Sequence, residues 1–286
     1  LLISDLNLNQ QESDELDKDI KSLKDDGFDI TLQLLDHHIT GKSSASKYDW
    51  YFLDDKRCAT KIVFDYLLKE FKAPLNDYKE WVDTVNAVDI WLENEKENFE
   101  FGKVLMSMVT KAREINSILF NSLDRDFKFY LLKNSIGFLS LENAPIVLDN
   151  SVHSLKKEFL KDGFDDTLDN LSASYLVKSL DKIKDDLTVY YNGQKGLMTY
   201  CLGAISIPAN SFLRANSDYD FFIDVGRKGN ASFRADGKLD VSQLASKLGN
   251  GGGHVNASGC KFDDFIETIN LQEVRAYIQN KLNNLK

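Results

Sequence analysis

The segment Asp36-His37-His38 constrains the fold of this chain most strongly, because it directly follows a stretch of alternating apolar residues over Phe28–Leu35. That alternation predicts a β-strand with one buried face. Leu1–Leu6 predicts an earlier strand, and the polar segment Glu12–Asp26 between the two predicts a helix that Gly27 ends. A strand, a helix and a strand with short connections form a βαβ unit, so we expect a parallel sheet in this half of the chain.

Ligands of open parallel sheets bind beyond the carboxyl ends of the strands. Asp5 ends the first expected strand and the Asp-His-His segment ends the second, so we expect both at one edge of the sheet. Imidazole and carboxylate groups together suit Mn²⁺ or a similar divalent cation better than metals that prefer thiolates. The pattern therefore predicts a candidate metal site, with two solvent-exposed loop histidines as the alternative interpretation.

Two further helices are predicted, one from Ala59 to Leu67 and one over Tyr78–Leu92. The second contains two acidic residues, Asp83 and Asp89, that compete as metal ligands. Apolar neighbours surround Asp89, so we expect its carboxylate to be at least partly buried and to need a partner. An Asp on a helix is otherwise commonly a solvated surface group.

The sequence predicts an α/β protein with two domains and a helical connection. We expect an N-terminal parallel-sheet domain over residues 1–120, a helical linker over 121–185 and a smaller domain with a mixed sheet over 186–286. Short apolar runs and turn residues predict the elements of the last domain: strands over Leu187–Tyr191, Leu197–Ile207, Phe221–Val225 and Ala231–Arg234, a turn at Asn192-Gly193, and a helix over Val241–Leu248 capped by Asp240.

A second motif is Gly249-Asn250-Gly251-Gly252-Gly253-His254, which follows the expected helix over Val241–Leu248. Successive glycines let backbone N–H groups approach an anion closely, and His254 can donate a hydrogen bond to a phosphate oxygen. Glycine runs also occur in loops that bind nothing. Alone, this motif only suggests a phosphate contact.

The charge balance limits the classes of partner. A formal net charge of −10, from 35 Lys and Arg against 45 Asp and Glu, disfavours the wrapping of long duplex nucleic acid, since that needs a positive surface. Short anionic substrates stay compatible with a local cluster of cations. Three widely spaced cysteines predict neither disulfides nor a zinc cluster. Without an apolar run near the roughly 18 residues of a membrane span, we expect a soluble protein of the cytoplasm.

Together, the two motifs resemble the DHH phosphoesterase family with its DHH-associated C-terminal domain. The resemblance covers nearly the whole chain and is greatest to the nanoRNases, which are NrnB-type oligoribonucleases, and more distant to RecJ exonuclease. It rests on Asp-His-His at a strand end, followed about two hundred residues later by Gly-Gly-Gly-His-x-x-Ala-Ser-Gly. It extends to four further segments: Ile3–Leu6, Leu34–Leu35, Val88–Trp91 and Ser232–Arg234.

The resemblance implies a role for each motif residue. Asp5, His37 and Asp89 would bind metal, Asp36 would orient His37, and His38 would face the scissile phosphate. Substrate would be bound in the C-terminal domain by Arg234, Gly251, Gly252, Gly253 and His254.

The resemblance also implies a preceding strand that ends in a His-x-Asp-x-Asp motif and completes a site for two ions, expected to be Mn²⁺, with Mg²⁺ or Co²⁺ as alternatives. Leu1 opens inside an expected strand without Met, so we expect a segment of the full protein to precede it. The alternative is a degenerate relative without this motif.

The implied function is metal-dependent hydrolysis of short oligoribonucleotides to mononucleotides. Two alternatives stay open. One is a phosphatase for 3′-phosphoadenosine 5′-phosphate, linear dinucleotides or polyphosphate, and the other is a nucleotide-binding module without activity. The expected partner is a short single-stranded oligonucleotide or a nucleotide, rather than a membrane or a long duplex, and a homodimer is compatible with the sequence.

Overall fold

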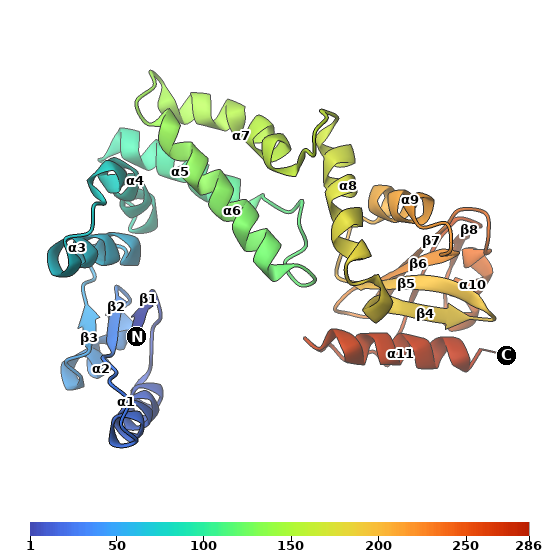
Figure 1. Ribbon diagram of the computed structural model, residues 1–286, viewed down its shortest axis with the longest axis horizontal. Helices are drawn as coiled ribbons and strands as arrows, with labels where there is room; N and C mark the ends of the chain where they lie inside the picture. The colour runs from blue at the N-terminus through green and yellow to red at the C-terminus, as the bar shows by residue number, and fades with distance from the viewer. Residues whose placement is uncertain (286) are drawn as a thin grey trace. The chain divides into compact units, whose positions relative to one another are not determined.

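The computed structural model describes residues 1–285, which divide into two compact units. Unit 1 contains residues 1–111 and 132–152, and unit 2 contains residues 112–131 and those from 153 onward. Each unit has its own sheet (Figure 1). The α/β class, with one parallel and one mixed sheet, is confirmed. The predicted domain boundaries at residues 120 and 185 stay a prediction.

The sheet of unit 1 has three parallel strands in the order β1-β2-β3, so their carboxyl ends lie at one edge. The first helix begins with a capping box, in which Asn9 and Glu12 each accept a hydrogen bond from the backbone N–H of the other. The elements are β1 (Leu2–Ser4), α1 (Gln10–Asp25), β2 (Gln33–Asp36), η1 (Ile39–Gly41), α2 (Lys42–Lys47), β3 (Tyr51–Leu53) and α3 (Ala59–Phe71).

The helix that ends at Asp89 packs closely against the following helix, which contains Gly102. A Cβ atom added to Gly102 would lie 2.5 Å from the carbonyl oxygen of Thr84, so glycine is needed for the two helices to approach at this point. Helices are present where the sequence predicts them, over Tyr78–Leu92 and in the region 121–185. From Asn76 to Leu187 the elements are η2 (Asn76–Tyr78), α4 (Lys79–Asp89), α5 (Lys96–Thr110), α6 (Asn121–Ser135), η3 (Ile136–Phe138), α7 (Ala144–Leu160), α8 (Leu168–Asp181) and η4 (Lys184–Leu187).

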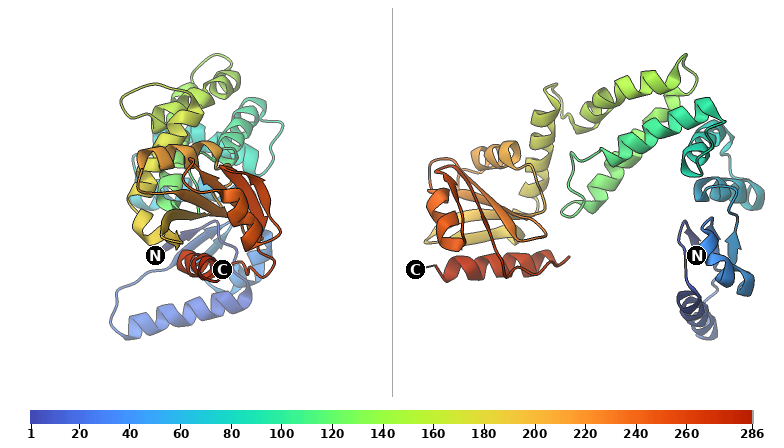
Figure 2. Two further views of the ribbon diagram at one scale, coloured as in Figure 1. Left: turned by 90° about the vertical axis from the view of Figure 1, so that its right-hand side faces the viewer. Right: turned by 180° about the vertical axis from the view of Figure 1, so that it is seen from behind.

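The sheet of unit 2 has six strands in the order β4-β5-β6-β7-β9-β8, with β5 and β6 parallel and all other neighbours antiparallel. Figures 1 and 2 show α9 on one face of this sheet and α11 on the other. The elements are β4 (Thr188–Tyr191), β5 (Gln194–Tyr200), α9 (Ser206–Ala215), β6 (Phe221–Val225), β7 (Asn230–Ala235), α10 (Val241–Leu248), β8 (Gly252–His254), β9 (Ala257–Lys261) and α11 (Leu271–Asn283).

Several sequence predictions of local structure are confirmed. Asn192 and Gly193 both have positive φ angles, 48° and 79°, which makes the tight turn between β4 and β5. Asp240 caps α10 by accepting hydrogen bonds from the N–H groups of Ser242 and Gln243. None of the helices in residues 1–285 combines the length and the apolar composition that a bilayer span needs.

Two strand predictions are wrong in extent. The strand expected over Phe28–Leu35 starts only at Gln33, and the Phe28 side chain is exposed. β1 has three residues and pairs with β2 from Gln33 onward, so the residues before Gln33 have no strand to pair with. The strand expected over Leu197–Ile207 ends at Tyr200, and the chain then turns into α9.

Candidate functional site

Asp5 stands at the carboxyl end of β1 in a conformation that is rare for a residue with a side chain. Its φ angle is 56°, in the left-handed region that Asp tolerates better than most residues. Its N–H donates to the carbonyl oxygen of Leu35 on β2 at 3.1 Å. The backbone thus leaves the sheet immediately after β1, and the Asp5 carboxylate lies beside the end of β2.

Three predicted ligands converge at this edge of unit 1. The Nε2 atom of His37, just after β2, lies 3.2 Å from an oxygen of Asp5 and 3.7 Å from an oxygen of Asp89 at the end of α4. The His37 side chain is 16% exposed, whereas Asp5 is 62% and Asp89 is 46% exposed. The expected burial of Asp89 is therefore wrong, because α4 ends there and its last side chain emerges at the open edge.

Asp83, the competing candidate, is engaged elsewhere. Its two carboxylate oxygens accept hydrogen bonds from the ammonium groups of Lys61 and Lys79. Burial works to raise the pKa of Asp83, but these hydrogen bonds outweigh it and hold the pKa below its ordinary value. Of the two acidic residues, only Asp89 lies beside His37.

The buried Asp36 carboxylate orients His38 rather than His37, so the expectation that it orients His37 is wrong. The Nδ1–H group of His38 donates to one oxygen of Asp36 at 2.7 Å, and the Tyr51 hydroxyl donates to the other at 2.8 Å. The hydrogen bond to Asp36 raises the pKa of His38. Burial works to raise the pKa of Asp36, but its hydrogen bonds from His38 and Tyr51 lower it overall.

The donor set of this edge fits a divalent cation. Ligand atoms of Asp5, His37 and His38 all lie within 4.8 Å of one another, the one such group of three among residues 1–285. Two ligands about 2.1 Å from one cation lie at most about 4.2 Å apart, so the separations from His37 Nε2 to Asp5 and Asp89 suit shared binding. Carboxylate oxygens with imidazole are ligands that Mn²⁺ and similar ions accept.

In unit 2, two predicted substrate contacts lie in one row across the outer strands of the sheet. Arg234 on β7 pairs with Ala257 on β9, which pairs with His254 on β8. Side chains of directly paired residues lie on the same face of a sheet. The Arg234 guanidinium and the His254 imidazole thus lie on either side of the small Ala257 methyl group. The next row of paired residues consists of Ser232, Gly259 and Gly252.

The Arg234 guanidinium is held in place on both sides. One terminal nitrogen donates to the carbonyl oxygen of Phe233 and the other to the hydroxyl of Ser206 at the start of α9, both at 2.8 Å. Its position is therefore fixed before any ligand arrives, which lowers the entropy cost of binding.

The three glycines of the second motif differ in surroundings. A Cβ atom on Gly251 would lie 2.5 Å from atoms of Cys260 and Gly259, and one on Gly253 would lie 2.6 Å from the Ala257 carbonyl oxygen. A Cβ atom on Gly252 would meet nothing within 4 Å. Gly251 and Gly253 are thus required by packing, whereas Gly252 leaves open space beside the row of Arg234 and His254.

Tyr51, Ser206 and Asp224 contribute to these sites and were not predicted. Asp224 accepts hydrogen bonds from the N–H groups of Leu202 and Gly203 and so shapes the segment that leads to Ser206. The sequence signal for Tyr51 is its place on the strand after the Asp-His-His segment, a position that can reach the same edge. No local pattern marks Ser206 or Asp224.

The chain is similar to several known proteins. The model of the DHHA1 domain matches residues 203–284. The chain is 43% identical over 289 residues to a 3′,5′-cyclic-nucleotide phosphodiesterase of Helicobacter pylori, covering 99% of this chain and 83% of the relative. It is 24% identical over 307 residues to oligoribonuclease NrnB of Bacillus subtilis, covering 100% of this chain and 66% of the relative.

A solved structure has the same fold. The crystal structure of an uncharacterized protein from Helicobacter pylori G27 has a TM-score of 0.86 and 44% identity, covering 99% of this chain and 82% of that chain. With a relative at 43% identity along almost the entire sequence and a matching DHHA1 domain, the chain is a hydrolase that belongs to the DHH family of phosphoesterases.

Proposed function

We propose that this phosphoesterase hydrolyses 3′,5′-phosphodiester bonds of small nucleotides, with short oligoribonucleotides as its main substrate class. The observation that carries the proposal is the convergence of Asp5, His37 and Asp89 at one sheet edge. The 24% identical relative is named as an oligoribonuclease, which supports the choice of substrate.

Asp5, His37 and Asp89 would hold divalent cations, expected to be Mn²⁺. Cations in such a site supply positive charge to the phosphate oxygens and activate water for attack on phosphorus. The fold positions these three side chains. The His37 ring is largely buried and therefore restricted, and the two exposed carboxylates of Asp5 and Asp89 face it.

His38 would bind the scissile phosphate. Its Nδ1 atom is taken by Asp36, so Nε2 is the ring nitrogen left for a phosphate oxygen. The side chain is 44% exposed and thus accessible to a substrate. Asp36 and Tyr51 fix the ring orientation, which keeps the Nε2 direction constant.

Arg234 and His254 would bind a phosphate or the adjacent ribose of the nucleotide. A planar guanidinium can donate two parallel hydrogen bonds to phosphate, and an imidazole on the same sheet face adds a third donor. Gly252, with its open side, would let the backbone come close to the nucleotide.

A second candidate substrate is a 3′,5′-cyclic nucleotide. The relative at 43% identity is named as a 3′,5′-cyclic-nucleotide phosphodiesterase. In chemical terms, a cyclic nucleotide contains the same 3′,5′-diester as RNA, closed within one nucleotide. One site can therefore attack both, and the contacts to the group on the 5′ side decide the preference.

The test is a panel of substrates given to the full-length protein with Mn²⁺. It would include RNA dinucleotides to pentanucleotides, 3′,5′-cyclic AMP, 3′-phosphoadenosine 5′-phosphate, polyphosphate and a long single-stranded RNA. We expect mononucleotide release from the short RNAs, faster than from the long RNA. Faster cleavage of cyclic AMP than of any dinucleotide would favour the second candidate. Nucleotide binding without hydrolysis of any of these would contradict an enzymatic function.

A further inference from the structure

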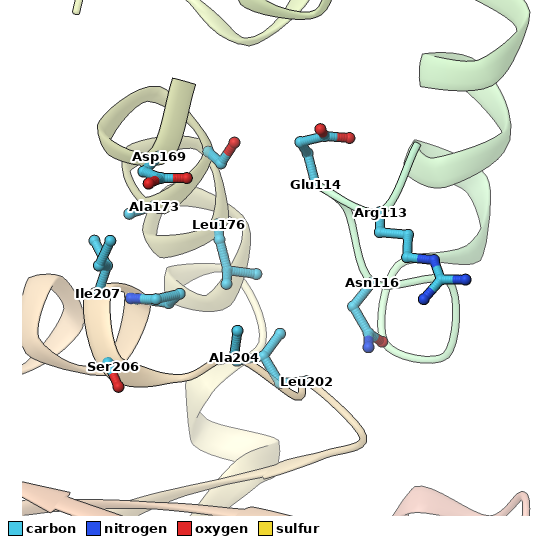
Figure 3. Close-up of a pocket in the computed structure, with 12 residues that line it drawn as sticks. Arg113, Glu114, Asn116, Asp169, Ala173, Leu176, Leu202, Ala204, Ser206 and Ile207 are labelled. Carbon is cyan, nitrogen blue, oxygen red and sulfur yellow. The ribbon is translucent and has the colours of Figure 1, made fainter. Parts of the chain in front are cut away.

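Unit 2 contains a cavity of about 430 Å³ that neither motif accounts for. Its walls are α8, the segment 113–116 and the residues that lead into α9 (Figure 3). A volume of this order suits a small ligand such as a nucleoside. Half of the lining is apolar and comes from two of these walls: Ala173 and Leu176 of α8, and Leu202, Ala204, Ile207 and Pro208.

Hydrogen bonds hold the segments that form the walls of the cavity. Asp224 accepts from the N–H groups of Leu202 and Gly203 at 2.9 and 3.0 Å. The Asn116 amide donates to the carbonyl oxygen of Cys201 at 2.6 Å and accepts from the N–H of Ile118 at 3.0 Å. The Asn116 hydrogen bond therefore holds the segment 113–116 against the residues before α9.

The cavity lies next to the proposed phosphate contact. Ser206 lines it, and the Ser206 hydroxyl accepts a hydrogen bond from the Arg234 guanidinium at 2.8 Å. A molecule bound here would thus have an apolar part in the cavity and an anionic part near Arg234. A nucleotide has this composition.

Charge in the lining gives no net attraction for a chain of phosphates, because the cation Arg113 stands against the carboxylates of Glu114 and Asp169. Glu114 and Asp169 face the cavity from opposite walls (Figure 3). Glu114 is balanced by Lys156 at 2.7 Å, whereas the carboxylate of Asp169 adds negative charge. Carboxylates repel further phosphates but accept hydrogen bonds from the amino groups and hydroxyls of a nucleoside.

We propose that this cavity is a nucleoside-binding subsite, which takes the base and ribose of the nucleotide whose phosphate Arg234 binds. The inference rests on the proposed function for the identity of its ligand. It adds that the protein recognises the nucleoside itself, so inorganic polyphosphate, which has nothing to fill the cavity, is a poor ligand.

The test compares the binding of AMP and ribose 5-phosphate, which differ by the base alone, to the full-length protein by calorimetry. We expect AMP to bind at least about tenfold more tightly. Ala204→Trp, at an exposed position of the lining, should reduce this preference to near one by filling the cavity. Ile207→Asn, which adds no bulk, should reduce it by a smaller factor. Ala215→Trp, at the other end of α9 and outside the lining, is the matched control and should keep the preference.

Equal affinity for the two ligands, or an unchanged preference in Ala204→Trp, would overturn the inference. This outcome is separable from a failure of the proposed function. Hydrolysis of dinucleotides without any base-dependent affinity would remove the subsite alone. Base-dependent affinity without hydrolysis would remove the proposed activity and leave the subsite.

Discussion

Asp36 accepts a hydrogen bond at 2.7 Å from His38, the second residue after it, while His37 between them points to Asp5 and Asp89. The two imidazole rings lie close together, with their centroids 4.3 Å apart, but they contact different carboxylates. Under the proposed function, His37 would bind metal and His38 would bind phosphate. The Asp-His-His segment would then combine two roles in three consecutive residues.

Tyr51→Phe should weaken catalysis through His38. Removing the hydroxyl takes away one hydrogen bond to the buried Asp36 carboxylate. We expect the free energy of unfolding to fall by about 1 to 2 kcal/mol, and kcat to fall about three- to tenfold through a less fixed His38 ring. Thermal unfolding and steady-state kinetics on a dinucleotide measure both. An unchanged kcat with a lower stability would show that Asp36 orients His38 without Tyr51.

Asp89→Asn should reduce metal affinity, and Asp83→Asn is its matched control on the same helix. Asp89 lies beside His37, whereas Asp83 is bound by Lys61 and Lys79. We expect Mn²⁺ affinity to fall about 100-fold or more in Asp89→Asn and to stay unchanged in Asp83→Asn. Calorimetric titration with Mn²⁺ measures both. Equal loss in the two variants would make Asp83 part of the site.

Asp83→Asn should instead have an effect on stability that depends on pH. The pKa of Asp83 is lowered in the folded protein, so its stabilising contribution is present above the unfolded pKa and is lost as pH falls through the folded pKa. We expect the variant to be less stable by about 0.5 to 1 kcal/mol at pH 7, with a difference that shrinks below about pH 4. Denaturation at a series of pH values is the measurement, and a difference that grows at low pH would contradict the assignment.

Gly252→Val and Gly251→Ala should separate binding from folding. Gly252 has open space on its side of β8, so valine should fold normally but fill the strip beside Arg234 and His254. We expect KM to rise about tenfold, or roughly 1.4 kcal/mol, with an unchanged melting temperature. Gly251→Ala would bring a Cβ atom within 2.5 Å of Cys260 and should cost about 1 to 3 kcal/mol of stability. An unchanged KM in Gly252→Val would place the nucleotide away from this strand.

The sequence predicted the end of β2 better than its beginning. Asp36 closes a buried strand as expected, because Leu34 and Leu35 are fully buried and directly precede it. The start was misplaced because the length of β2 depends on its partner β1, which pairs only from Gln33 onward. The local apolar pattern does not show how far a strand pairs with a distant segment.

Contacts over long sequence separations account for what the sequence missed in the sites. Tyr51 and Asp36 are 15 residues apart, and Asp224 and Leu202 are 22 apart. Asp224 accepts a hydrogen bond from the N–H group of Leu202 just after β5. This helps to explain why the chain turns there instead of continuing as a strand to Ile207. The helices α9 and α11 were not predicted.

The most direct measurement of the central claim is dinucleotide hydrolysis with Mn²⁺ by the full-length protein and by His37→Ala. His37 is the residue that both Asp5 and Asp89 face, so its removal should empty the centre of the cluster. We predict a loss of turnover of about a thousandfold or more, or roughly 4 kcal/mol, with folding retained in the melting curve. Equal turnover by the two proteins would contradict the account.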